Sequence, residues 1–78
     1  SGPACVSMII TVKQTGKLEL LGDDIELPAL RTLFQLTGKT MPAGTEVVIT
    51  IEQGGAPAVA ASVVAAATES GLSRVITR

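Results

Sequence analysis

The chain has 78 residues, enough for one small domain that buries roughly 60% of the surface its unfolded chain would expose. Hydrophobic residues make up 46% of the sequence, but Phe34 is the only aromatic residue, so bases and sugars would find no stacking platform. A net charge of −1 with scattered basic residues argues against nucleic-acid binding. The sequence has no histidine and only one cysteine, Cys5, which excludes a four-ligand zinc site.

The first elements in the chain are expected to form a hairpin. Residues 1–5 are expected to be a linker or an expression-vector remnant, in which Cys5 is either an inert thiol or one half of an intermolecular disulfide. Residues 6–13 alternate in polarity and predict a strand with one apolar face. Residues 14–17 predict a turn, residues 18–21 an antiparallel return strand, and residues 22–24 a second turn.

A helix is predicted next, over Leu27–Leu36. Pro28 suits its first turn, where the missing N–H group leaves no hydrogen bond unmade. Apolar residues at helical spacing predict a face that packs on the core, and Gly38 suits the position just past the helix end. Residues 39–44 are then expected to form a loop.

The second half of the chain predicts a β-α-β unit. Residues 45–52 predict an apolar strand, either covered on both faces or lying in the middle of a sheet. An Ala/Val-rich helix is predicted from Pro57 to Ser70, ended by Gly71. A last strand over residues 73–77 is expected to lie parallel to strand 45–52. The chain therefore predicts a small α/β (α+β) domain, a mixed sheet of β-β-α-β-α-β order with two helices on one face.

Two segments are candidate contact sites. The loop that follows the strand over residues 45–52 could bind an anion at the N-terminus of the next helix. The residues of this candidate site are Glu52, Gln53, Gly54, Gly55 and Pro57. The last strand, if it lies at a sheet edge, would offer unpaired backbone groups for self-association, through Arg74, Val75, Ile76 and Thr77.

Catalysis, metals and cofactors are not expected. The acidic residues Asp23, Asp24 and Glu26 are interpreted as a solvated turn before the helix, and no serine has a histidine to activate it. Two readings remain open: an interaction module, and a small anion- or ligand-binding regulatory domain that uses residues 53–57.

The order of elements and several segments resemble the periplasmic domain of the ExbD/TolR family of biopolymer-transport proteins. The matching segments are Ile9–Leu18, Leu20–Ile25, Leu27–Leu36, Val47–Glu52 and Val63–Val75. Glu52 and Pro57 fall where family members often carry an acidic residue and a proline before the second helix. The chain departs from that pattern where Ala58 and Val59 replace a tyrosine and a glycine.

The resemblance implies a single-pass protein on the periplasmic side of a bacterial inner membrane, with its transmembrane helix upstream of residue 1. A homodimer would sit within ExbB/TolQ-like subunits that use the proton motive force for transport. The domain over residues 6–78 would act by dimerising and by contacting peptidoglycan or a TonB/TolA-like partner.

Overall fold

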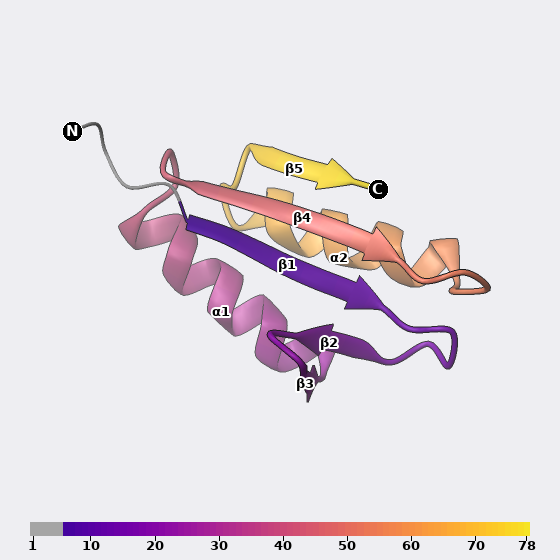
Figure 1. Cartoon of the computed structure of the whole chain (residues 1–78). Helices are drawn as coiled ribbons and strands as arrows, with labels where there is room; N and C mark the ends of the chain where they lie inside the picture. The colour runs from indigo at the N-terminus through magenta and orange to yellow at the C-terminus, as the bar shows by residue number, and fades with distance from the viewer. Residues whose placement is uncertain (1–5) are drawn as a thin grey trace.

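The structure, a computed structural model that describes residues 6–78, is a five-stranded mixed sheet with two helices (Figure 1). The elements are β1 (Val6–Val12), β2 (Leu18–Leu20), β3 (Asp23–Ile25), α1 (Leu27–Thr40), β4 (Thr45–Ile51), α2 (Pro57–Glu69) and β5 (Arg74–Thr77). This confirms the predicted fold class, with one more strand than predicted. The expected linker over residues 1–5, with Cys5, lies outside the described residues.

The sheet has the order β3-β2-β1-β4-β5. The two long strands, β1 and β4, run parallel at its centre, and β5 lies parallel to β4 at one edge (Figure 1). Strands β1, β2 and β3 form an antiparallel meander toward the other edge. Of the two alternatives for β4, the structure shows the position in the middle of the sheet, and the predicted parallel pairing of the last strand is confirmed.

Both helices pack on the same face of the sheet. The hydrophobic core lies between this face and the two helices. Because side chains alternate along a strand, the even-numbered residues of β1 and the odd-numbered residues of β4 share this face, where Ile10 pairs with Ile49. Phe34 on α1 and Val63 on α2 are fully buried against them. The small residues of α2 are also buried at Ala60, Ala66 and Ala67, so this helix lies close to the sheet.

Two predicted boundaries are wrong. Residues 22–24 do not close a simple turn: a two-residue turn at Leu21 and Gly22 folds Asp23–Ile25 back on β2 as a third strand. The first helix does not end before Gly38 but continues to Thr40. Gly38 lies inside the helix because α1 and α2 touch there, and a Cβ atom at this position would collide with the backbone carbonyl of Ser70.

Candidate functional site

Strand β5 lies at the sheet edge, as the sequence allowed. The Arg78 N–H donates to the Ile49 carbonyl at 2.8 Å, and the Ile51 N–H donates to the Arg78 carbonyl at 3.2 Å. Since successive residues of a strand point their backbone groups to opposite sides, Ile76 also bonds to β4. Val75 and Thr77 therefore direct their N–H and C=O groups away from the sheet, where another strand could pair with them.

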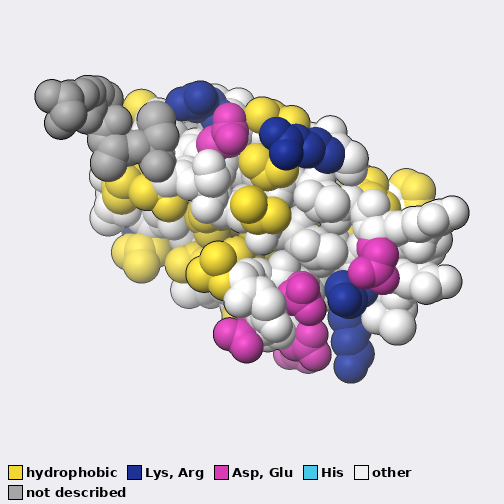
Figure 2. All heavy atoms as spheres, viewed as in Figure 1, with side chains coloured by type: hydrophobic (Ala, Val, Ile, Leu, Met, Phe, Trp, Pro, Cys, Tyr) yellow, Lys and Arg dark blue, Asp and Glu magenta, His cyan; other side chains and the backbone are white. Residues whose placement is uncertain are grey.

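The sheet face opposite the helices carries an apolar row that reaches this edge. Ile9, Val48 and Ile76 are in register across β1, β4 and β5. Ile9 and Ile76 are 51% and 39% exposed, whereas Val48 between them is only 5% exposed. Arg74 pairs with Glu46 at 3.7 Å beside the row. Figure 2 shows hydrophobic side chains on this open face next to basic side chains.

Glu52, predicted as a loop contact, has a partly exposed side chain that is engaged by other residues of this chain. Its carboxylate accepts the backbone N–H of Gln14 at 3.0 Å and lies 3.4 Å from the Lys13 ammonium, which also lies 3.8 Å from Glu19. The hydrogen bond from Gln14 keeps the pKa of Glu52 below its usual value, and Lys13 adds to this effect. The hydrogen bond with Glu52 and the charge of Glu19 raise the pKa of Lys13.

The loop over residues 53–57 packs against the turn between β1 and β2. The Gly55 N–H donates to the Glu52 carbonyl at 2.7 Å, and a Cβ atom at Gly54 would lie 3.1 Å from the Gln14 side chain. Pro57 begins α2, whose N-terminus receives no side-chain cap. The basic side chain that lies beside Glu52, Lys13, is engaged by two carboxylates. This arrangement weighs against an anion site in the loop.

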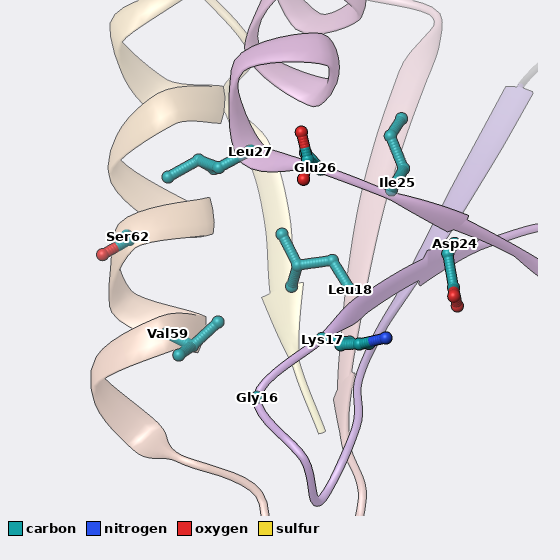
Figure 3. Close-up of a pocket in the computed structure, with 9 residues that line it drawn as sticks. All are labelled: Gly16, Lys17, Leu18, Asp24, Ile25, Glu26, Leu27, Val59 and Ser62. Atoms are coloured by element: carbon teal, nitrogen blue, oxygen red, sulfur yellow. The ribbon is translucent and has the colours of Figure 1, made fainter.

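A pocket of about 470 Å³ opens between α2, the β1–β2 turn and the segment that leads into α1. In Figure 3, Leu18 and Val59 face each other across it, and Leu27 points from the start of α1 toward α2. The Ser62 hydroxyl points away from the pocket and donates to the Ala58 carbonyl at 3.1 Å. The pocket is thus an apolar slot with carboxylates and one lysine at its rim, suited to holding an apolar side chain.

Sequence reasoning missed this pocket because its walls come from three segments that are far apart in the chain.

Among residues 6–78, no group of three or more aspartate, glutamate or cysteine residues is placed to hold a metal ion. Neither helix in this range has the length and apolarity needed to cross a membrane.

Comparison with known proteins gives no family for this chain: no family model matches it, and no curated protein matches it at a significant level.

Proposed function

We propose that this domain acts by adding strands at the β5 edge, and that it is the periplasmic module of a proton-motive-force-coupled inner-membrane transport complex. The observation that carries the first part is the row of unpaired backbone groups at Val75 and Thr77, beside an apolar open face. The second part rests on the resemblance of residues 6–78 to the ExbD/TolR family. In this proposal β5 forms a homodimer, and the remaining surface contacts peptidoglycan or a TonB/TolA-like protein.

The backbone directions restrict how two copies of β5 can pair. Antiparallel pairing about Val75 joins the outward-facing residues 73, 75 and 77 of both copies and forms six hydrogen bonds. It also places Arg74 opposite Ile76 of the second copy. Moving the register by two residues leaves four bonds and sets Arg74 opposite Arg78, and like charges in direct opposition destabilise a sheet. We therefore propose the register centred on Val75.

The dimer is tested with a proline at an outward-facing position. Thr77→Pro removes one N–H group that points away from the sheet and keeps the bonds to β4, so the monomer stays folded. Thr77→Val keeps the N–H group and is the matched control. In analytical ultracentrifugation at high concentration, we expect the wild type and Thr77→Val to dimerise and Thr77→Pro to remain monomeric. A monomeric wild type, or a Thr77→Pro dimer, would refute pairing through β5.

The assignment to a transport complex has a separate test. The coding sequence upstream of Ser1 should encode an apolar helix of about 20 residues that contains one aspartate. A pull-down of the domain with purified peptidoglycan, compared with a pull-down by the periplasmic part of a TonB/TolA-like protein, then identifies the partner. An upstream sequence without such a helix would exclude the membrane assignment and leave strand pairing at β5 unaffected.

A further inference from the structure

A second unpaired edge lies at the start of β1. Strand β2 pairs with β1 only from Ile10 to Val12 and then turns away at Leu21. The Val6 N–H donates to the Gly44 carbonyl and the Val12 carbonyl accepts the Glu52 N–H, so the even-numbered residues of β1 bond toward β4. The backbone groups of Ser7 and the N–H group of Ile9 therefore point toward the place that a longer β2 would fill, whereas the Ile9 carbonyl faces the N–H group of Leu21.

This place is also an apolar groove of about 290 Å³ between β1, α1 and the β2–β3 turn. Four large hydrophobic residues of its lining are exposed at the surface: Val6 at 41%, Leu21 at 85%, Leu36 at 59% and Met41 at 39%. Among residues 6–78, those that line it are all uncharged. Figure 2 shows hydrophobic side chains at the surface along α1 and near the start of β1.

Leu21 is the least expected of these residues. It has a φ of 55°, and Gly22 after it has a φ of 84°, as in the two-residue hairpin turn that favours asparagine followed by glycine. A leucine at this position accepts an unfavourable backbone conformation, and its side chain is left in water. Local folding does not account for this choice, whereas a contact between Leu21 and a partner does.

The size of the patch indicates a peptide rather than a globular partner. The four exposed fractions correspond to roughly 400 Å² of surface, similar to the largest apolar patch on an ordinary monomer, which is often functional. A stable interface between folded subunits buries about 800 Å² on each partner. An extended segment needs less area because its backbone hydrogen bonds to the strand edge add affinity.

The charges at the two ends of the groove give the peptide a direction. Asp23 and Asp24 follow Leu21 at one end, and Lys39 lies in the last turn of α1 near the other. A peptide that runs antiparallel to β1 enters beside Leu21 and leaves beside Met41. Its basic residue then belongs at the N-terminal end and its acidic residue at the C-terminal end.

We propose that the groove between β1 and α1 binds an extended peptide as an added strand antiparallel to β1, with apolar residues at alternate positions and a basic N-terminal end. Its backbone pairs with Ser7 and Ile9, and its apolar side chains contact Leu36 and Met41. This site lies across the sheet from β5 and does not depend on the dimer.

The test uses the capped synthetic peptide KVTVTVE and, as a control of equal composition, KTVVVTE. In an NMR titration we expect KVTVTVE to shift the amide signals of Ser7, Ile9 and Leu21 and to slow exchange of the Ile9 amide. KTVVVTE should bind at least about tenfold more weakly, because its apolar side chains no longer share one face. No binding by KVTVTVE, equal binding of both peptides, or shifts confined to β5 would overturn the proposal.

Two variants separate recognition from folding. Leu21→Asn suits the turn and should keep or raise the melting temperature while it weakens peptide binding, and Leu36→Lys should weaken binding by about tenfold. Ala61→Lys, at an exposed position of α2, is the control and should bind as the wild type does. Unchanged affinity in both Leu21→Asn and Leu36→Lys would contradict the assigned groove.

Discussion

A single carboxylate joins two turns at one end of the sheet. Glu52 follows β4, and its side chain holds Gln14 and Lys13 in the turn after β1. Because the folded protein lowers the pKa of Glu52, its contribution to stability is present above the ordinary value of 4.5 and is lost as the pH falls through the lower folded value.

We therefore expect Glu52→Gln to be less stable than the wild type at neutral pH, with a difference that shrinks as the pH falls below 4.5. Urea unfolding at a series of pH values measures this. Glu69→Gln, at an exposed position near the end of α2, is the control. A difference that is constant from pH 7 to pH 3 would mean that the pKa of Glu52 is the same in the folded and unfolded states.

Gly38 sets the closest approach of the two helices. Glycine in the middle of a helix usually weakens it, so replacement by alanine would ordinarily stabilise the protein by about 0.5–1 kcal/mol. Here the added methyl group meets the Ser70 carbonyl, which is backbone and has little freedom to move. We expect Gly38→Ala to lower the free energy of unfolding by about 1–3 kcal/mol, as overpacking does.

Lys39→Ala, one residue further along α1, should change the free energy of unfolding by less than about 0.5 kcal/mol, because Lys39 is exposed. Chemical denaturation of both variants compares the two effects. A Gly38→Ala variant as stable as Lys39→Ala would show that the helices separate at little cost.

At the scale of elements, α1 presents two faces with different roles. Phe34 and Leu30 are fully buried, whereas Leu36 is 59% exposed. Phe34→Ala should cost about 3–5 kcal/mol, which is a large part of the stability of a domain of this size. Leu36→Ala should change stability by less than about 0.5 kcal/mol. Urea denaturation gives both values, and equal losses would contradict the assignment of the core face.

Strand and helix types could be predicted because alternation along residues 6–13 and the apolar run over residues 45–52 reflect local burial. The errors arose where a distant contact decides the outcome. Asp23 and Asp24 have low strand propensity, yet they pair with β2 because the turn at Leu21 brings them there. Gly38 was expected to mark the end of the helix. The structure shows instead that glycine is needed at this position because the backbone of Ser70 lies so close.

The candidate surfaces also differ in how far they depend on contacts between distant parts of the chain. The parallel pairing of β5 with β4 could be predicted from the β-α-β unit, whereas its position at the sheet edge was only a condition that the structure meets. The groove beside β1 could not be predicted, since its exposure depends on where β2 stops and on which face of α1 lies beneath it. Leu21 falls within the strand expected over residues 18–21, so the turn that exposes its side chain was not predicted either.

The whole molecule has two edges where further strands could pair, and amide exchange distinguishes them from the sheet interior. In β5 the amide of Ile76 faces β4 and that of Thr77 faces outward, and in β1 the amide of Ile10 faces β4 and that of Ile9 faces the groove. We expect fast exchange at Ile9 and Thr77 and slow exchange at Ile10 and Ile76 in dilute protein.

Raising the protein concentration should protect Thr77 and leave Ile9 exchanging fast, because only β5 is used in the proposed dimer. Adding the peptide KVTVTVE to dilute protein should do the reverse. NMR hydrogen exchange measures all four amides in one experiment. Protection of both edges by either treatment would mean that the two edges are coupled, which the two separate proposals exclude. Because the amides of Ile9 and Ile10 are adjacent in sequence but face opposite ways, different exchange rates at these two residues report strand pairing and not local fraying.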